Sequence, residues 1–575
     1  MILHVMKQLR IQKALNLLST QNKTRNNPIN SNYRYDLLFL LTISILCFIS
    51  NSFVVYVIPA INYALFFSIS FFEIFTLFFI SILFSKCKRI FYIFQILTIS
   101  ILLILILIES FTALNFSLVF CQRVIDIISE TNFVESFGFL KSYLNLSSII
   151  ISIIILTFLF TFIRLSLKQK HLIVLSKKQI KIFLITYVLT FSYLIPYIYG
   201  YIRYHDGQGL PQYTSITRLF HSYYLHYLES KRINLLIDLS SNCHPISNRF
   251  EESIIVVIIG ESHSKYHSQL YGYPINNEPL LTSRLQNGEL VLFTNVVSIS
   301  DHTHGAISSI MSLSNSSKDD FFSQHLFPVV LKESGWNTIM LDNQYILNAS
   351  ESSFMTNEEL SRKMFSQRNT KRFATDEDMI DNHQFQTQNR QLYVIHLLGQ
   401  HYDYETNCPK SFKKFSSLVY KNSDKTDNQK KTLAAYDNIT LYNDYIINKI
   451  IDIFEDKNAI VIYFSDHGEE VCDNDEYFGH GNAAFNKNRF KYQIEVPFFI
   501  WMSKEYINYH KDIAKAIHEK SNCKYLTDDI SHTLLDLAGV RIDGFDETRS
   551  LLSSKFKERT RIVLGSINYD KVEQE

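Results

Sequence analysis

The chain has 575 residues, of which 47% are hydrophobic, and its formal net charge is +1. This length favours more than one domain, and the lack of a long block of like charge argues against a nucleic-acid partner. The composition changes along the chain. Leu, Ile and Phe dominate up to about residue 202, and the remainder has the scattered charge of a soluble protein. The sequence therefore predicts a membrane part followed by a globular part.

Five apolar segments in the first part have the length and composition of membrane-spanning helices. A helix needs about 20 apolar residues to cross the hydrocarbon core of a bilayer. Because the backbone must satisfy its own hydrogen bonds there, helices are the structure that such segments adopt. We therefore predict a transmembrane domain over residues 36–202, with helices at 36–57, 63–84, 90–108, 147–162 and 182–202.

Basic residues set the orientation of these helices. Lys and Arg gather before the first segment, between the second and third, and between the fourth and fifth, while the other connections carry few. The positive-inside rule then places residues 1–35 in the cytoplasm. With five spans, everything after about residue 203 lies on the far side, which in a Gram-negative cell is the periplasm. The expected location is thus the inner membrane, with the globular part in the periplasm.

Residues 203–250 separate the membrane part from the globular domain expected at 251–575. Aromatic residues recur in this stretch at roughly helical spacing, which is typical of a bridging amphipathic helix resting on the membrane surface; a solvated linker helix fits the same pattern. Seven cysteines show no CxxC pair. Four of them lie in the exported part, where one or two disulfides are an option.

Short apolar runs in the globular domain alternate with helical patterns and end in polar residues. They are "SIIVVIIGES", "GWNTIMLDNQ", "QLYVIHLLGQH", "AIVIYFSDHGEE" and "EVPFFIWMS". Unbroken β-branched runs that alternate with helices predict buried parallel strands with helices on both faces of the sheet. Sites in such sheets form beyond the carboxyl ends of the strands, where most of these runs place charged or imidazole groups.

Three of those groups suit a metal ion. Glu261 follows "IIVVIIG", and Asp466 and His467 follow "AIVIYFS". A carboxylate at the end of a buried strand is costly unless it is paired or binds a metal. Two carboxylates and one imidazole suit Zn²⁺ with a fourth position open, and Mn²⁺ is the weaker alternative. The competing interpretation is that both carboxylates cap helices after their strands.

The stretch "SISDHTHGAISS" at 298–309 can supply a nucleophile to such a metal. A Thr or Ser hydroxyl bound to zinc loses its proton far more readily and can attack phosphorus. His401 ends its strand, and His480 follows "SDHGEE" closely. Both are placed to stabilise charge on a phosphoryl group. His396 lies inside its strand, and we expect it to be structural.

The ordered set "GESHSKYHSQLYGYPINNEPLL", "SDHTHGAISSIMSLS", "ESGWNTIMLDNQ", "IHLLGQHYDY" and "FSDHGEEVCDNDEYFGHGNAAFNKNRFKYQIEVPFFIW" resembles the bacterial phosphoethanolamine transferases, membrane members of the alkaline phosphatase/sulfatase superfamily. The resemblance covers nearly the whole chain. It implies an αβα sandwich of the alkaline phosphatase/sulfatase type after a five-helix transmembrane bundle. It also implies transfer of the phosphatidylethanolamine headgroup, through a zinc-bound threonine, to lipid A, a core sugar of lipopolysaccharide or another surface glycan.

The same resemblance assigns roles to residues. Glu261, Asp466, His467 and the nucleophile would be the zinc ligands, and His401 and His480 would hold the phosphate. The segment "ETNFVESFGFLKSY" also resembles a family motif. Its Thr131 and Glu135 stand one helical turn apart and could face the ethanolamine ammonium, although a solvated interfacial helix explains the spacing as well.

Two departures from the family pattern bear on the nucleophile and the acceptor. Where the family threonine would align, this chain can be read as Gly305, with Thr303 two residues before it and Ser308 three after. We predict Thr303 as the nucleophile and Ser308 as the alternative. No cysteine flanks Thr303, so the disulfide hairpins of the lipid A-modifying type are not evident, which favours a core sugar or another glycan as acceptor.

Other functions remain open at this point. They are a phosphodiesterase or sulfatase of the same fold, a phosphoglycerol transferase, and a degenerate member without catalysis. The usual sulfatase nucleophile lies in a C/S-x-P-x-R run, which is missing near residue 303.

Glu73 lies within the second apolar segment. An intramembrane carboxylate suggests function, but a bond to a neighbouring helix ranks slightly ahead.

Overall fold

The computed structural model divides the chain into two compact units. Unit 1 comprises 1–51, 61–106 and 153–214, and unit 2 comprises 52–60, 107–152 and 215–575. The described residues are 34–57, 63–85, 87–116, 119–122, 124–125, 146–166, 172–174, 177–204, 214–247, 252–315, 321–345, 354–388, 390–475, 477–481, 483 and 487–572.

Five long helices coincide with the five predicted membrane segments. Among the described residues, four are long and apolar enough to cross a membrane, over Leu37–Val55, Leu65–Phe84, Lys88–Ala113 and Lys178–Pro196. The fourth predicted segment, 147–162, lies within a helix of 21 residues. The bounds are α2 (Leu37–Val57), α3 (Tyr63–Phe84), α4 (Lys88–Phe116), α7 (Leu146–Ser166) and α8 (Lys177–Tyr204).

The intramembrane carboxylate Glu73 has a helical neighbour. Asn51 of α2 donates its side-chain amide to Glu73 Oε2 of α3 at 3.0 Å and to Ser70 Oγ at 3.2 Å. All three side chains are buried. A bond from Glu73 to a neighbouring helix, which was the preferred interpretation of this carboxylate, is therefore present in unit 1.

The short strands β1 (Arg34–Asp36) and β2 (Leu172–Val174) pair antiparallel in the same unit.

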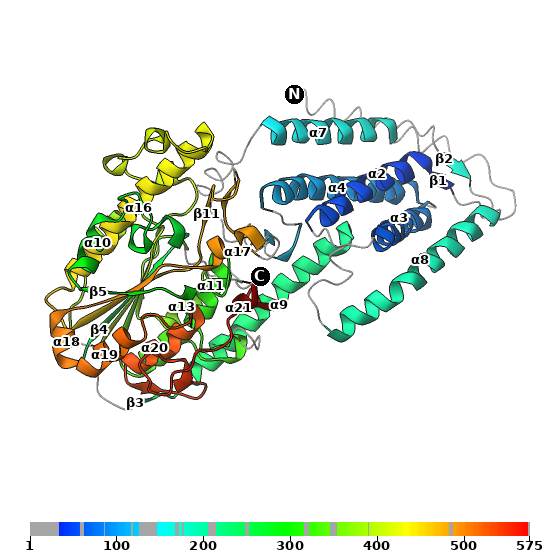
Figure 1. Ribbon diagram of the computed structural model, residues 1–575. Coiled ribbons are helices and arrows are strands. Elements are labelled where there is room, and N and C mark those ends of the chain that lie inside the picture. The colour runs from blue at the N-terminus through cyan, green and yellow to red at the C-terminus, as the bar shows by residue number, and fades with distance from the viewer. Residues whose placement is uncertain are drawn as a thin grey trace, which may run out of the picture. The chain divides into compact units, whose positions relative to one another are not determined.

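Unit 2 is built on a seven-stranded sheet in the order β5-β13-β10-β4-β9-β7-β8 (Figure 1). All five predicted strands are present in it. Strands β10, β4, β9, β7 and β8 are parallel. The bounds are β4 (Ile254–Gly260), β5 (Leu290–Phe293), β7 (Asn337–Asp342), β8 (Gln367–Arg368), β9 (Gln391–His396), β10 (Ala459–Ser465) and β13 (Phe498–Met502).

The expectation of parallel strands is wrong for one of the five runs. Strand β13 runs antiparallel to β10 and to β5. The cause lies in the segment before it, α17 (Lys487–Ile494). Gly468, just after β10, donates its amide to the carbonyl of Gln493 in α17 at 2.9 Å. The chain thus stays at the carboxyl edge of the sheet after β10, so that the next strand must run back across it.

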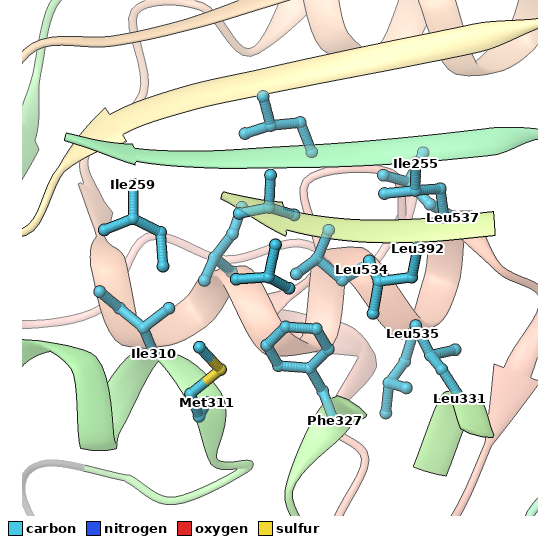
Figure 2. Close-up of a cluster of buried hydrophobic side chains, with 14 of the residues drawn as sticks. Ile255, Ile259, Ile310, Met311, Phe327, Leu331, Leu392, Leu534, Leu535 and Leu537 are labelled. Atoms are coloured by element: carbon cyan, nitrogen blue, oxygen red, sulfur yellow. The ribbon is translucent and has the colours of Figure 1, made fainter. Parts of the chain in front are cut away.

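Helices cover both faces of this sheet, as its buried strands require. Alternate residues of β4 enter two separate cores, with Ile255 and Ile259 in one and Ile254 and Ile258 in the other. Figure 2 shows the first core, where Ile259 lies above Ile310 and Met311, and Leu392 above Leu331 and Leu535. Helices α9, α11, α12, α13, α19 and α20 contribute to this core, and α10 and α16 to the other.

The helices of unit 2 are α9 (Ser215–Ser241), α10 (Pro279–Gln286), α11 (Thr303–Met311), α12 (Phe327–Glu333), α13 (Glu358–Met364), α14 (Asp376–Asp381), α15 (Tyr404–Asn407), α16 (Asp427–Ile453), α18 (Lys504–Tyr509), α19 (Lys511–Glu519), α20 (Ile530–Leu537) and α21 (Tyr569–Val572), besides α17. Two-stranded pairs join β11 (Glu470–Val471) to β12 (Phe478–Gly479), β14 (Tyr525–Leu526) to β6 (Val296–Val297), β15 (Val540–Arg541) to β3 (Ile246–Ser247) and β16 (Ile562–Val563) to β17 (Ile567–Asn568).

The structure bears on two points that the sequence left open, the role of segment 203–250 and the state of the cysteines. Helix α9 lies within the expected bridging segment 203–250, and its second half belongs to the core of unit 2 through Ile233, Leu236 and Ile237. The seven cysteines are all among the described residues, and the structure records no disulfide between them. The option of one or two disulfides in the exported part is therefore not realised here.

Candidate active site

Two neighbouring strands deliver the predicted metal ligands to one point. Strands β4 and β10 pair in register from Ile254 opposite Ala459 to Gly260 opposite Ser465. The next residues are Glu261 on one strand and Asp466 and His467 on the other, and all three are fully buried. His467 Nε2 lies 3.4 Å from Glu261 Oε1 and 3.2 Å from Asp466 Oδ2. The predicted metal ligands therefore meet at the carboxyl edge of the sheet.

The backbone beyond β4 is held in an uncommon conformation. Ser262 has a φ of 57°, in the left-handed region that non-glycine residues rarely occupy. Its amide donates to Asp466 Oδ1 at 3.2 Å, and its hydroxyl donates to Glu261 Oε1 at 2.7 Å. Tyr436 of α16 donates to its carbonyl at 2.7 Å. Strain of this kind persists where the surroundings over-determine it, and such places cluster at functional sites.

Thr303 reaches the same point from another element. It is the first residue of α11, and its Oγ1 lies 3.0 Å from Glu261 Oε2 and 3.3 Å from His467 Nε2. The N-terminus of a helix carries partial positive charge, which favours an anion beside it. Gly305 lies inside α11, where an added Cβ would come within 2.6 Å of Ser300 Oγ. A side chain at 305 would therefore displace Ser300, whereas Thr303 faces the carboxylate.

The alternative nucleophile points elsewhere. Ser308 also lies on α11, but it is buried and its hydroxyl donates to the backbone carbonyl of His304 one turn earlier.

Asp301 lies in the loop just before α11 and joins that loop to the segment after β12. Its Oδ1 lies 3.0 Å from His302 Nδ1, and its Oδ2 accepts from the amide of Ala483 at 2.9 Å. The loop that leads into Thr303 is thus tied to the segment that follows His480.

His480 stands next to the other ligands. Its ring centroid lies 4.0 Å from that of His467, and ligand atoms of Glu261, His467 and His480 all lie within 4.8 Å of one another. The Nδ1 of His480 is 2.7 Å from Glu469 Oε2, and Glu469 also accepts from the Tyr404 hydroxyl. Glu469 is fully buried. This carboxyl group therefore fixes the orientation of the His480 ring.

The two remaining histidines differ in how they relate to the site. His401 is partly buried, and it acts electrostatically on Glu261, so that the two side chains lie within charge range of each other. His396 is fully buried in β9, where its Nδ1 lies 3.2 Å from Asp342 Oδ1. Gln344 bridges it to the site, because its amide nitrogen lies 3.0 Å from both His396 Nε2 and Glu261 Oε2. His396 therefore pairs with Asp342 and supports a candidate ligand through Gln344.

The charges of these buried groups oppose one another. Burial favours the neutral form of Glu261, but His467 and then His401 and His480 hold the pKa of this carboxyl group well below its usual range. Burial and the charge of Glu261 raise the pKa of Asp466 to about 7. Burial disfavours charge on His467, yet Asp466 and Glu261 raise its pKa to about 10. Burial lowers the pKa of His401 to about 4. The pair of buried carboxylates therefore needs positive charge beside it.

The arrangement fits a tetrahedral metal ion. Ligand atoms about 2.0–2.1 Å from zinc in a tetrahedron lie roughly 3.3 Å from one another. The separations here are 3.0 and 3.3 Å from Thr303 Oγ1 to Glu261 and His467, 3.4 Å from His467 to Glu261, and 3.2 Å from His467 to Asp466. In addition, Asp466 Oδ2 is buried without a hydrogen-bond partner. A carboxylate, imidazole and hydroxyl set of this size suits zinc better than calcium or magnesium.

Sequence reasoning missed three groups that support the site: Ser262, Gln344 and Glu469. Each lies beside a motif that was singled out, in "GES", "LDNQ" and "SDHGEE". The signal that could have found them is a polar residue after the end of a buried strand, the same signal that identified Glu261. Thr131 and Glu135, predicted to contact the ethanolamine, lie outside the described residues.

Comparisons with known proteins identify relatives of this chain. The chain is 28% identical over 365 residues to phosphoethanolamine transferase EptC of Escherichia coli strain K12, covering 59% of this chain and 61% of that one. It is 29% identical over 279 residues to phosphoethanolamine transferase EptA of Helicobacter pylori, covering 46% and 51%. The alignments thus span between about half and three fifths of these curated relatives. They confirm the resemblance to phosphoethanolamine transferases.

A solved structure shares the fold over most of the chain. The integral membrane protein lipooligosaccharide phosphoethanolamine transferase A from Neisseria meningitidis is 16% identical, with a TM-score of 0.61 over 89% of this chain and 97% of that one. An integral membrane protein therefore has the same architecture as this chain, in which apolar helices are followed by a mixed α/β domain. The sulfatase family profile matches residues 253–540, which hold every described residue of the candidate site. On the strength of that match, the chain belongs to the sulfatase family.

Proposed function

We propose that this protein transfers phosphoethanolamine from phosphatidylethanolamine to lipopolysaccharide, on lipid A or a core sugar, or to another surface glycan. The observation that carries the proposal is the position of Thr303 Oγ1, 3.0 Å from Glu261 and 3.3 Å from His467 at the start of α11. The names of the relatives supply the class of group that is transferred. The proposed location is the inner membrane, with the N-terminus in the cytoplasm and the site in the periplasm.

The cofactor that we propose is Zn²⁺, with Mn²⁺ as the weaker alternative. Glu261, Asp466, His467 and Thr303 would hold it, and His480 lies close enough to join them. When bound, zinc would lower the pKa of the Thr303 hydroxyl and draw charge from the phosphoryl oxygens. The donor set itself supports the ion, through its separations near 3.3 Å and through Asp466 Oδ2, which is buried without a hydrogen-bond partner.

The chain's own residues account for the two halves of the reaction. In the first, Thr303 Oγ1 forms a bond to the donor phosphorus while the bond from phosphorus to the diacylglycerol oxygen breaks; the threonine proton leaves, and the diacylglycerol oxygen takes one up. In the second, an acceptor oxygen forms a bond to phosphorus while the bond from phosphorus to Thr303 Oγ1 breaks; the acceptor hydroxyl loses its proton, and Thr303 Oγ1 takes one up. His401 and His480 would lie beside the phosphoryl oxygens and carry protons to and from the leaving and entering groups.

Mass spectrometry of the full chain tests the nucleophile and the donor together. The protein is purified from a cell that contains phosphatidylethanolamine, and the peptides across 291–317 are mapped. We expect an adduct of roughly 123 Da, the mass of a phosphoethanolamine group, on Thr303, and its loss in Thr303→Ala. Ser308→Ala is the matched control on the same helix and should keep the adduct. An adduct on Ser308 would overturn the assignment of Thr303.

A transfer assay separates the enzyme from a degenerate relative. Headgroup-labelled phosphatidylethanolamine and lipopolysaccharide are incubated with the wild type and with Thr303→Ala. Label should reach the lipopolysaccharide with the wild type alone. If the protein transferred label from phosphatidylglycerol and not from phosphatidylethanolamine, the phosphoglycerol transferase hypothesis would replace this one. If neither donor were used and the purified protein contained no zinc, the protein would be a non-catalytic member.

A further inference from the structure

A cavity of about 180 Å³ lies at the edge of the seven-stranded sheet that ends with β8. Buried residues of β7 and α14 line it, among them Ile339, Leu341 and Met379. The exposed side chains of Gln367 in β8 and Asn382 after α14 line it as well, so the cavity opens to solvent. All ten lining residues are described and belong to unit 2. None of them is part of the candidate active site, so the cavity is a separate feature of this unit.

Two polar atoms of the lining residues are buried and find no hydrogen-bond partner among the described residues. They are Nε of Arg368 and Nε2 of His383. The side chain of Arg368 is only 3% exposed. A buried polar group without a partner costs free energy, so each such group needs a physical explanation, such as a water molecule or a ligand that bonds to it. Both atoms belong to one cavity, which therefore has room for a ligand that bonds to them.

The guanidinium of Arg368 is held in place by its other nitrogens. Its Nη1 donates to the carbonyl of Met355 at 2.9 Å and to Ser361 Oγ at 3.4 Å. Its Nη2 donates to Asp342 Oδ2 at 2.7 Å and to the carbonyl of Tyr345 at 3.3 Å. A guanidinium has five N–H donors in a fixed geometry, so the Nε–H is the one that these bonds leave over. Because this donor is fixed before a ligand arrives, a ligand would bind to it without the cost of ordering a long side chain.

The charges around the cavity favour an uncharged ligand. Arg368 is the one residue with a permanent charge among the ten that line the cavity, and the carboxylate of Asp342 neutralises it. Burial lowers the pKa of His383, so its ring is neutral at neutral pH. A hydroxyl group suits the two unpartnered atoms, because it can accept from the Nε–H of Arg368 and donate to a neutral imidazole nitrogen.

The size of the cavity matches a single six-membered ring. An apolar cavity of about 150 Å³ is large enough to bind benzene. The half-buried ring of Phe373 lines this cavity together with Ile339 and Leu341, and these groups can pack against the apolar face of a ring. The side-chain amides of Gln367 and Asn382 at the opening can bond to further hydroxyl groups.

We propose that this cavity binds a small uncharged ring compound that carries hydroxyl groups. A free phenol and a single sugar unit of a glycan share this chemistry. The proposal does not rest on the proposed function, because binding here requires neither a metal ion nor group transfer.

Side-chain contacts join the cavity to the candidate active site. Asp342, the partner of Arg368, has its Oδ1 at 3.2 Å from His396 Nδ1. The amide nitrogen of Gln344 then lies 3.0 Å from both His396 Nε2 and Glu261 Oε2. A ligand that accepts from Arg368 would therefore bind to one end of a buried polar chain that has Glu261 at its other end.

Fluorine NMR on the full chain tests the proposal with two probes that distinguish the sources of the ligand. One is 4-fluorophenol, which has a flat apolar ring and one hydroxyl, and the other is 2-deoxy-2-fluoroglucose, which has a sugar ring. We expect at least one of them to bind with a Kd on the order of 1 mM, seen as broadening of its fluorine signal. Fluorobenzene, which lacks the hydroxyl, and 4-fluorobenzoate, which is charged, should bind at least fivefold more weakly.

Three variants locate the binding. Asn382→Trp places a large side chain at the opening and should abolish binding, whereas Asn422→Trp, the matched control at an exposed asparagine outside the lining, should bind as the wild type does. His383→Phe keeps a ring beside Phe385 but removes Nε2, and it should weaken binding about fivefold. Comparing the variants under one detergent condition cancels the partition of each probe into detergent.

Two results would overturn the proposal. If neither probe bound to the wild type, or if Asn382→Trp bound them equally well, the cavity would hold only water. If fluorobenzene or 4-fluorobenzoate bound as tightly as the hydroxyl probes, the assignment of an uncharged hydroxyl ligand would be wrong. Binding of 4-fluorophenol alone would identify a free phenol as the ligand class, and binding of the fluorinated sugar would identify a glycan unit.

Discussion

Glu278 offers a test of the buried charges that does not involve the candidate site. Its carboxyl group is fully buried at the start of α10, where Oε2 accepts from Ser268 and from the amide of Leu270. Its Oε1 has no hydrogen-bond partner, and neither has His263 Nε2, which lies 3.4 Å away. Burial lowers the pKa of His263 to about 3, so this ring is neutral. A proton on Glu278 would satisfy both orphan atoms at once.

The pKa of Glu278 agrees with that arrangement. Burial raises it from 4.5 to about 8. The folded state then binds one more proton than the unfolded state between these two values, so the free energy of unfolding falls as the pH rises through this window. The stabilisation is fully present below pH 4.5 and lost above pH 8. Because one pKa unit corresponds to about 1.36 kcal/mol, the loss between pH 5 and pH 9 has an upper limit of about 4 kcal/mol.

Glu278→Gln removes the titration but keeps the shape and the hydrogen bonds of the protonated acid. We expect the variant to melt close to the wild type at pH 5 and above it at pH 9. One kcal/mol moves the melting temperature of a large unit by on the order of 2 °C, so the upper limit is about 8 °C. Both tryptophans of the chain lie in unit 2, so intrinsic fluorescence reports the melting of this unit in the full protein.

Comparing Glu278→Gln with the wild type at each pH removes the contribution of the other buried acids to the pH dependence of stability. Glu469, Asp437 and Asp444 also have raised pKa values, caused by burial, but they titrate equally in both. If the difference between variant and wild type were the same at pH 5 and pH 9, Glu278 would be ionised throughout. His263 would then donate from Nε2 to the carboxylate, and the reasoning from burial would be wrong.

Three further predictions concern the candidate site and the thiols. Asp466→Asn should lower the zinc content measured by elemental analysis from about one ion per chain to a small fraction, whereas Ser308→Ala should retain it. Glu469→Leu should lower kcat by about tenfold with little change in KM, because His480 loses the partner that orients it; Glu469→Gln, which can still bond to His480, should stay close to the wild type. A reducing agent should leave the melting temperature unchanged, since the structure records no disulfide among the seven cysteines, all of them described; a clear drop would show that a disulfide forms.

Most of the strands of unit 2 could be predicted because each one is marked by a short pattern in its own sequence. An apolar run that ends in a polar residue marks both a strand and the edge at which its next side chain emerges. Glu261 and Asp466 were found this way, and they meet because β4 and β10 are neighbours in register. The direction of β13 had no such signal. It depends on where α17 lies after β10, and that position is fixed by a contact between Gly468 and Gln493, not by the pattern of the strand itself.

The choice between Thr303 and Ser308 shows a second limit. Both hydroxyls lie in one short stretch, and the residue that faces Glu261 depends on where α11 begins. Helix boundaries are the least certain part of any assignment from sequence, because terminal residues gain little from the helix itself. The structure begins the helix at Thr303, which aims Oγ1 at Glu261 and leaves Ser308 bonded inside its own helix.

Burial alone does not distinguish a site from a core. Glu261 and Glu278 are both fully buried glutamates in unit 2, yet their pKa values shift in opposite directions. Around Glu278 the one imidazole is neutral, so burial prevails and the carboxyl group keeps its proton. Around Glu261 three histidines outweigh burial, and the carboxylate stays charged. A buried acid that stays ionised needs a cation beside it, and a buried acid that takes up a proton does not. The cluster of ligand atoms from Glu261, His467 and His480, more than the depth of the carboxylate, is therefore what marks the carboxyl edge of β4 as a candidate place for a metal ion.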